Sequence, residues 1–428
     1  MPGKRSACGR RTFLAATGLF LGCGRHADPP RARHTTSTDE LDAARRDPHA
    51  SSLDASVDAS DDASAPDAPA PAPAPRSVFA LFEAYPALAK NIPRIELGWY
   101  PSRVERADTL APDGRLFVKR DDDFSRARTC PETFELARRF GGGKVRKLEA
   151  YLGEARARGA RRLITSGGIG SNQALAVARL GPALGFSVEV HLTPQPLSTL
   201  TTKNLGADAA TGAEMVLFES VSEGHARAVE AAKNDRSVYV IPPGGTTPLG
   251  TLGFVSAGLE LAADVRANRL PEPARLYVAL GLGGSAAGLA IGCALGGLST
   301  EVIAVRTSNP GTVTPATLSR IHDETLAFLR ARDATVPSLA ASATKIRIDP
   351  RFVGGGYGAP TTAGDQALAR AREAESWDLD PVYTGKALAA LFEDRRAGAR
   401  GELLFWNTMS SRPVESSAVP SAFQRYVR

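Results

Sequence analysis

Short apolar segments alternate with helical segments along most of this chain, and this alternation constrains the fold more than any other feature. Segments with the length and composition of buried strands lie at residues 116–119, 163–165, 186–192, 238–241, 276–280, 302–305 and 403–406. The residues between them have helical periodicity, as at 145–158. Strands that alternate with helices form parallel sheets, so the sequence predicts an α/β fold.

A glycine-rich turn, 281–288, follows the strand predicted at 276–280 and opens a helix of small residues. Free backbone N–H groups and the positive end of the helix dipole meet at such a turn, which makes it a phosphate cradle by geometry. A dinucleotide site is the first alternative. The strand 302–305 leads into Arg306, and no acidic residue stands at the distance expected for a ribose contact, which argues against a dinucleotide.

A second glycine run begins the stretch 141–149, which has the sequence GGGKVRKLE. It delivers Lys144 to a helix start, and Lys147 follows three residues later on the same helix face. The two amines could serve one ligand, one as a covalent amine for an aldehyde cofactor and the other as a charge for its phosphate. The alternative is a glycine turn followed by a solvated basic helix.

Composition limits the classes of protein that fit. With 428 residues, of which 43% are hydrophobic, the chain can form one large or two moderate domains. Its 52 basic and 46 acidic residues are interspersed, so the net charge of +6 does not indicate a nucleic-acid partner. The four cysteines form no CxxC pair and the six histidines lack ligand spacing, so the sequence predicts neither a disulfide framework nor a metal site.

The first 77 residues differ from the rest. Residues 1–25 resemble a signal peptide of the twin-arginine type, with Arg10 and Arg11 before an apolar run and a possible lipidation site at Cys23. Residues 26–77 contain almost no large apolar side chains, which predicts a disordered spacer. We therefore expect an exported protein, periplasmic or anchored through Cys23. A cytoplasmic protein, or a processed pro-segment in place of a spacer, remains the alternative.

An ordered set of motifs resembles one known family. The set comprises residues 119–122 (KRDD), 141–149, 167–173 (GGIGSNQ), 281–285, Tyr357, and 380–386 (DPVYTGK). It resembles the ACC deaminase and D-cysteine desulfhydrase family, which are pyridoxal-phosphate enzymes of the tryptophan synthase β-like fold (fold type II). The resemblance runs from about residue 78 to near the C-terminus. It implies a catalytic domain at 78–428, with a small α/β subdomain at about 147–255, the cofactor between the two subdomains, and a homodimer.

The resemblance also implies roles for individual residues. Lys144 would bind the cofactor aldehyde and then act as a base at Cα, its pKa lowered by burial and by the cation Lys147. The phosphate would be held by Lys147, Gly281, Gly283, Gly284 and Ser285. The substrate carboxylate would be held by Ser171, Asn172 and Gln173, with Asn172 also near the cofactor phenol oxygen. Tyr357 and Tyr383 would flank the substrate and transfer protons, the alternative being core aromatics.

Two further positions separate the members of this family. Thr384 stands where ACC deaminases have Glu facing the pyridine nitrogen and desulfhydrases have Thr, and Thr408 also favours the desulfhydrases. Gln173 points the other way, because desulfhydrases usually have His there. Other departures are Gly143 in place of Asn, residues 174–176 without the usual Arg and Gln, and residues 409–411 in place of Gly-Gly.

We therefore predict a pyridoxal-phosphate lyase that acts on a small amino acid by β-elimination. The product set expected for a D-cysteine desulfhydrase is pyruvate, ammonia and sulfide. The alternatives are ACC deamination and elimination from a related amino acid such as cysteate. A binding protein that keeps Lys144 and the phosphate loop without turnover is the alternative from another class.

Overall fold

The computed structural model describes residues 76–132 and 134–427. The signal peptide and lipidation site predicted at 1–25, and all but the last two residues of the spacer at 26–77, lie outside the described residues. Within the part that is described, no helix combines the length and apolar character needed to cross a membrane.

The larger of two sheets has six strands in the order β1-β2-β10-β7-β8-β9. Only β1 runs antiparallel to its neighbour, and the other pairs are parallel. The sequence predicted β2, β7, β8 and β10. It did not predict β9, or β1, in which three of the four residues are charged. The strands are β1 (Arg103–Arg106), β2 (Leu116–Arg120), β7 (Arg275–Leu280), β8 (Glu301–Arg306), β9 (Ile346–Asp349) and β10 (Leu403–Asn407).

The smaller sheet has four parallel strands in the order β5-β4-β3-β6, and it lies within the range 147–255 predicted for a subdomain. Its strands are β3 (Arg162–Gly168), β4 (Ser187–Thr193), β5 (Glu214–Leu217) and β6 (Val238–Ile241). Two predominantly parallel sheets with helical connections confirm the predicted α/β class.

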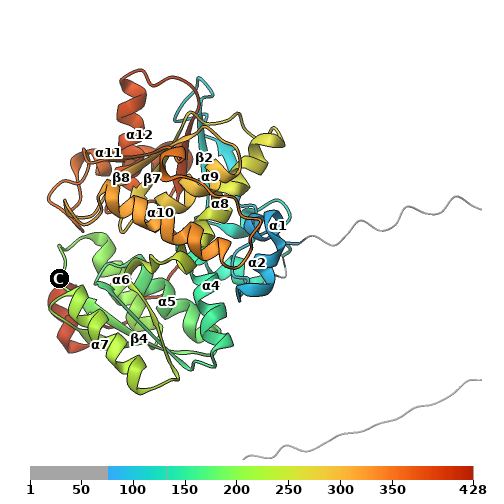
Figure 1. The fold of residues 1–428 in the computed structure, drawn as a ribbon. Coiled ribbons are helices and arrows are strands. Elements are labelled where there is room, and N and C mark those ends of the chain that lie inside the picture. The colour runs from blue at the N-terminus through green and yellow to red at the C-terminus, as the bar shows by residue number, and fades with distance from the viewer. Residues whose placement is uncertain (1–75, 133, 428) are drawn as a thin grey trace, which may run out of the picture. The chain divides into compact units, whose positions relative to one another are not determined.

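Helices cover both faces of each sheet, as Figure 1 shows for α9 and α12 around β7 and for α5 and α7 around β4. Along β7, Leu276, Val278 and Leu280 pack toward α8, α9 and α10, whereas Tyr277 packs toward α11 and α12. The helices are α1 (Ala80–Ala84), α2 (Pro86–Asn91), α3 (Glu135–Arg139), α4 (Lys144–Ala157), α5 (Asn172–Ala183), α6 (Thr199–Ala210), α7 (Val221–Asn234), α8 (Pro248–Arg266), α9 (Gly284–Leu295), α10 (Pro315–Arg330), α11 (Thr362–Glu375) and α12 (Thr384–Arg396), with short 3₁₀ turns η1 (Phe124–Arg126), η2 (Pro243–Gly245), η3 (Ala341–Ala343) and η4 (Ser421–Tyr426).

The polar segment 124–139 does not form one continuous helix. Its described residues form η1 and the five-residue helix α3, joined by turns around Cys130 and Pro131. Pro131 cannot donate a helical hydrogen bond, and Asp123 caps η1 by accepting from the N–H of Ser125. The segment therefore covers the start of α4 as a loop.

Glycines bring α8 and α9 unusually close together. A Cβ atom placed on Gly292 would lie 2.1 Å from the carbonyl oxygen of Val255, and one on Gly258 would lie 2.6 Å from the backbone nitrogen of Cys293. Only glycine permits this approach. The contact fixes the position of α9, whose N-terminus carries the glycine-rich turn 281–284.

Candidate active site

A cavity of about 480 Å³ is lined by segments that lie far apart in the sequence. Its walls come from the start of α4, the turns after β3 and β7, the turn η2, and the segment after β10. All the predicted site residues except one line it: Lys144, Lys147, Ser171, Asn172, Gln173, Gly281, Gly283, Gly284, Ser285, Tyr357, Tyr383 and Thr408. The exception is Thr384.

The glycine run before α4 joins the helix to two strand ends. Gly142 has a φ of +88°, its N–H donates to the carbonyl of Asp121 at 2.7 Å, and the next N–H, of Gly143, donates to the carbonyl of Thr408 at 3.0 Å. The positive φ requires glycine here. Lys144 is thereby placed as the first residue of α4, at the cavity.

Gly143 stands where the family pattern has Asn, and the structure shows why a side chain does not fit there. A Cβ atom at this position would lie 2.9 Å from Cζ of Phe254 and 3.0 Å from Cγ2 of Thr408. These two side chains fill the space of the absent amide. The departure is therefore compensated by packing.

Both lysines of α4 have lowered pKa values. Burial lowers the pKa of Lys144 to about 8. Burial, and secondarily the charge of Lys144, lowers the pKa of Lys147 well below its usual value. Of the two causes expected for Lys144, burial accounts for its lowered pKa, whereas the repulsion between the two amines acts on the pKa of Lys147.

A phosphate cradle lies at the start of α9. Gly283 has a φ of +98°, and a Cβ atom on Gly284 would lie 3.0 Å from Nζ of Lys147 and 3.2 Å from the hydroxyl oxygens of Thr246 and Thr251. Both threonine hydroxyls are buried and have no hydrogen-bond partner among the described residues. An amine, two free hydroxyls and a helix N-terminus thus converge on one small space.

The turn after β3 presents a second helix N-terminus. Ser171 caps α5, its hydroxyl oxygen accepting from the N–H of Ala174 at 3.2 Å. Asn172 is held by Asn204, whose amide donates to Oδ1 of Asn172 at 3.0 Å. Both amide atoms of Gln173 are buried without a partner in the described part of the chain. These groups are arranged to receive a carboxylate.

Two tyrosines form a hydrogen-bonded pair at the cavity. The hydroxyl oxygens of Tyr357 and Tyr383 lie 2.8 Å apart. Burial raises the pKa of Tyr357, and burial together with the neighbouring Tyr357 raises the pKa of Tyr383 well above its usual value. Both phenols therefore keep their protons at neutral pH and can donate them.

Thr384 is buried behind the cavity wall. Its hydroxyl donates to Oδ2 of Asp380 at 2.8 Å, and it accepts from the N–H of the same residue, also at 2.8 Å. Asp380, which does line the cavity, accepts further bonds from the N–H groups of residues 382–384. Burial raises the pKa of Asp380. Both carboxylate oxygens are thus occupied by the start of α12.

These residues fit pyridoxal phosphate. Lys144 supplies an amine for the aldehyde, and Lys147 with Thr246, Thr251 and Gly284 supplies donors for the phosphate. The negative charge of a phosphate would restore the proton to Lys147. Sequence reasoning missed both threonines and Asp380. The Gly/Pro-rich loop at residues 241–261 was the only signal for the threonines.

Comparison with known proteins gives the same assignment. The family model described as "Pyridoxal-phosphate dependent enzyme" matches residues 134–405. The chain is 34% identical to the nocardicin C-9' epimerase of Nocardia uniformis subsp. tsuyamanensis over 329 residues, which are 75% of this chain and 94% of the relative. It is 31% identical to the D-cysteine desulfhydrase of Salmonella paratyphi A over 333 residues, 74% of this chain and 94% of the relative.

A solved structure agrees with the sequence relatives. The crystal structure of an ACC deaminase homologue matches with a TM-score of 0.62 and 26% identity, covering 78% of this chain and 95% of the other. The fold is that of the fold type II pyridoxal-phosphate enzymes, as predicted. The chain therefore belongs to the pyridoxal-phosphate-dependent enzymes, within the ACC deaminase and D-cysteine desulfhydrase family.

Proposed function

We propose that this enzyme is a lyase that catalyses β-elimination from a small amino acid, in the manner of a D-cysteine desulfhydrase. The observation that carries the proposal is that one cavity holds both a lysine whose pKa is lowered to about 8 and a pair of protonated tyrosines. β-Elimination needs a base at Cα and a proton donor for the leaving group. Lys144 provides the base, and the tyrosine pair provides the proton donor.

Each step of the proposed β-elimination has a residue of the cavity to perform it. The start of α5, with Ser171 and Gln173, binds the substrate carboxylate and orients Cα toward Lys144. Lys144, once free, removes the proton from Cα. Bound pyridoxal phosphate supplies the sink for the electron pair left at Cα. The hydroxyl of Tyr357 or Tyr383 gives a proton to the departing sulfur.

The surroundings of Thr384 favour thiol elimination over ACC deamination. A carboxylate facing the cofactor ring nitrogen strengthens the electron sink, and opening a cyclopropane needs that strength more than releasing a thiol does. Thr384, at the position of that carboxylate, carries no charge, and its hydroxyl donates to Asp380 at 2.8 Å. The one nearby carboxylate that we find among the cavity residues, Asp380, is occupied by backbone N–H groups and by Thr384.

A substrate panel tests the proposal. The cofactor-loaded enzyme is given D-cysteine, L-cysteine, cysteate and ACC, and the 2-oxo acid product is measured: pyruvate from cysteine or cysteate, and 2-oxobutyrate from ACC. The proposal expects pyruvate and sulfide from a cysteine enantiomer, at a higher kcat/KM than 2-oxobutyrate from ACC. Turnover of ACC to 2-oxobutyrate in preference to all the other reactions would make the enzyme a deaminase. Cofactor binding without a 2-oxo acid from any of the four compounds would support the non-catalytic alternative.

Epimerisation at Cα is a second candidate, favoured by the 34% identical relative named as an epimerase. Removing the Cα proton with Lys144 and returning one from a tyrosine would invert the centre. The two candidates differ in the fate of a substrate that lacks a leaving group. Loss of optical activity and uptake of solvent deuterium at Cα of such an amino acid, without pyruvate, would identify an epimerase.

We also propose that the protein is exported, from the pair Arg10–Arg11 and the apolar run at 13–22. Twin-arginine export carries folded proteins, which suits an enzyme loaded with its cofactor before transport. Mass spectrometry of the mature N-terminus tests this. A lipidated Cys23 at the terminus would show anchoring, and an intact Met1 would contradict export.

A further inference from the structure

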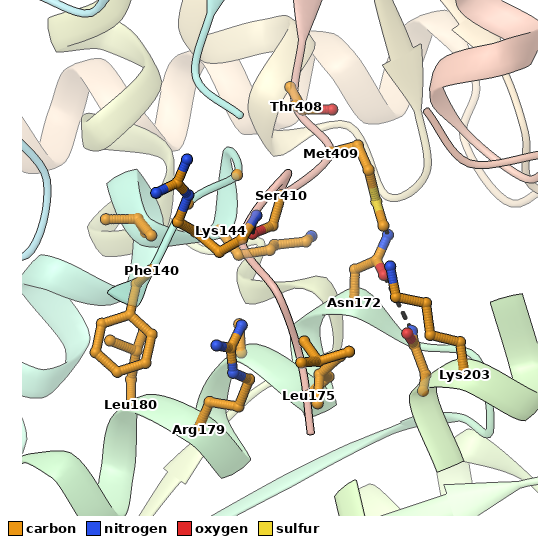
Figure 2. A pocket seen from close by; sticks show the side chains of 17 residues that line it. Phe140, Lys144, Asn172, Leu175, Arg179, Leu180, Lys203, Thr408, Met409 and Ser410 are labelled. Carbon is orange, nitrogen blue, oxygen red and sulfur yellow. Dashed lines mark hydrogen bonds between the residues drawn. The ribbon is translucent and has the colours of Figure 1, made fainter. Parts of the chain in front are cut away.

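A second, smaller cavity of about 50 Å³ lies beside the main one, and we refer to it as the side cavity. Lys144, Asn172 and Thr408 line both cavities, so the two share a wall. The remaining walls of the side cavity come from the turn before α4, from α5 and α6, and from the segment 409–414 (Figure 2). Its volume suits the end of a side chain rather than a whole ligand.

The side cavity is rich in positive charge. Besides Lys144, its lining includes Arg179, Lys203 and Arg412, and it includes no Asp or Glu. Arg412 forms an ion pair with Asp123, but its Nε is buried without a partner among the described residues. The lining therefore carries more cations than the neighbouring carboxylates neutralise.

Arg179 and Lys203 are the cations of the lining that no carboxylate of the described residues neutralises. Within the described residues, neither has a carboxylate oxygen within ion-pair distance. Arg179 donates to two backbone carbonyls, those of Arg139 and Pro413, both at 3.1 Å. Figure 2 shows Arg179 directed from α5 into the space beneath Lys144, and Lys203 extending from α6 toward Asn172.

The charges around Arg179 do not compensate for its burial. Burial lowers its pKa, the charge of Arg139 lowers it further, and the charge of Glu415 only partly offsets these effects. An anion in the side cavity would relieve the repulsion and supply the missing counter-charge.

Several departures of this chain from its family pattern lie around the side cavity. Leu175 and Ala176 fall in the stretch that lacks the usual Arg and Gln, and Met409 and Ser410 fall in the stretch that replaces Gly-Gly. All four line the side cavity, and none of them lines the main one. Two of the departing stretches therefore meet at the side cavity, whereas the departures at Gly143 and Gln173 lie at the main one.

We propose that the side cavity binds the end of the substrate side chain, and that the preferred substrates are amino acids whose β-substituent ends in an anionic group such as a carboxylate. The inference rests on the proposed β-elimination. With the amino-acid portion at Lys144 and Ser171, the β-substituent passes the contact between Asn172 Nδ2 and Met409 Sδ, which are 3.8 Å apart. The flexible thioether of Met409 can move aside to admit it.

The reaction is balanced with S-carboxymethylcysteine as the probe. The Cα proton is removed and the Cβ–S bond breaks, its electron pair staying on sulfur. The sulfur takes a proton and leaves as mercaptoacetate. Water hydrolyses the remaining three-carbon fragment to pyruvate and ammonia, so no oxidant or reductant is needed.

A matched pair of substrates tests the proposal. S-carboxymethylcysteine and S-carbamoylmethylcysteine have nearly the same shape, but only the first is anionic. Each enantiomer of both is given to the cofactor-loaded enzyme, and kcat/KM is measured from pyruvate. We expect a preference of about tenfold or more for the anionic compound, the ratio that one charge-assisted hydrogen bond provides.

Variants assign that preference to the side cavity. Lys203→Met and Arg179→Leu should each bring the ratio of the two kcat/KM values toward one. Lys203 is exposed and makes no hydrogen bond to the described residues, so its replacement does not endanger folding. Arg227→Leu, which removes an exposed arginine of α7 that lines neither cavity, is the matched control and should keep the wild-type ratio.

The outcomes separate this proposal from the proposed function. Equal kcat/KM values in the wild type, or pyruvate from cysteine but from neither S-substituted compound, would overturn the role of the side cavity and leave β-elimination intact. If no amino acid yields pyruvate, the proposed function fails. In that case, titration calorimetry of the same two compounds with the cofactor-loaded enzyme tests the side cavity separately. Tighter binding of the anionic compound supports the anionic site, and equal binding or no binding overturns it.

Discussion

Lys144 and Lys147 share one acceptor: both side-chain amines donate to the carbonyl oxygen of Gly244, at 3.5 Å and 3.0 Å. One turn of α4 therefore brings two amines to a single point in a buried cavity. Burial lowers both pKa values, and the charge of Lys144 lowers that of Lys147 further. The arrangement suits a ligand that has an aldehyde for one amine and a phosphate for the other.

The lowered pKa of Lys144 predicts how cofactor loading depends on pH. An amine must be uncharged to attack an aldehyde, so the rate at which apoprotein binds pyridoxal phosphate covalently should rise with pH and level off above about 8. Stopped-flow absorbance of the lysine-bound cofactor measures this rate. A rate that keeps rising toward the ordinary lysine pKa of 10.5 would show that Lys144 is not perturbed.

The free hydroxyls of Thr246 and Thr251 predict a loss of cofactor affinity on substitution. Thr246→Val or Thr251→Val removes one phosphate donor, and each should weaken pyridoxal-phosphate binding by about tenfold. Equilibrium dialysis measures the affinity. Thr165→Val is the matched control, because the hydroxyl of Thr165 donates to the carbonyl of Ile241 at 2.9 Å, away from the cavity. An equal loss in the control would mean that the effect is structural.

Gly284→Ala tests the same phosphate cradle by filling its space rather than by removing a donor. The new methyl group would enter the space between Lys147 and the two threonines, 3.0 Å from the amine. Lys147 can move, so the protein should still fold, but we expect pyridoxal-phosphate affinity to fall by about a hundredfold or more. Unchanged affinity in dialysis would place the phosphate elsewhere.

The tyrosine pair predicts a loss of turnover without a loss of fold. Tyr357→Phe and Tyr383→Phe each remove a proton donor, and we expect kcat to fall by about 10² to 10⁴, the usual contribution of such a group. Tyr277→Phe is the control, since that buried hydroxyl donates to Asp394 at 2.8 Å outside the cavity. Wild-type kcat in both cavity variants would assign the tyrosines to the core alone.

A buried ionic network holds α4 in place and should contribute to the free energy of unfolding. Arg146, fully buried between the two lysines in sequence, donates to Asp121 at 2.7 Å and to Glu260 at 3.0 Å. Arg146→Met would leave both carboxylates without this partner and should lower the free energy of unfolding by about 3–5 kcal/mol. Denaturant unfolding measures the change, with the exposed Arg156→Met of the same helix as control. A loss below about 1 kcal/mol would contradict this role.

The sequence predicted the α/β class and the segments around the cavity because each segment carries a local signal. Lys144 follows a glycine run, Ser171 precedes an apolar helix, and Gly283 and Gly284 follow a buried strand. The positions of Thr246, Thr251 and Asp380 at the site depend instead on tertiary contacts between distant segments. Isolated threonines have no periodicity. Asp380 begins the motif 380–386, but the motif alone does not show that its carboxylate binds the start of α12.

Two other differences have the same origin. The pKa of Lys144 could be predicted to fall, but the burial that lowers it is a property of the assembled cavity. The fit of Gly143 depends on Phe254, more than one hundred residues further along the chain. Neither the burial of Lys144 nor the contact of Gly143 with Phe254 can be predicted from a short stretch of sequence.

Reductive trapping tests the central assignment most directly. The enzyme loaded with pyridoxal phosphate is treated with borohydride, which makes the lysine–cofactor bond permanent, and is then digested and sequenced by mass spectrometry. We predict that the label lies on Lys144, and that the Lys144→Ala variant carries none there and lacks the visible absorbance band. A label on Lys147 or on another lysine of the wild-type protein would contradict the assignment.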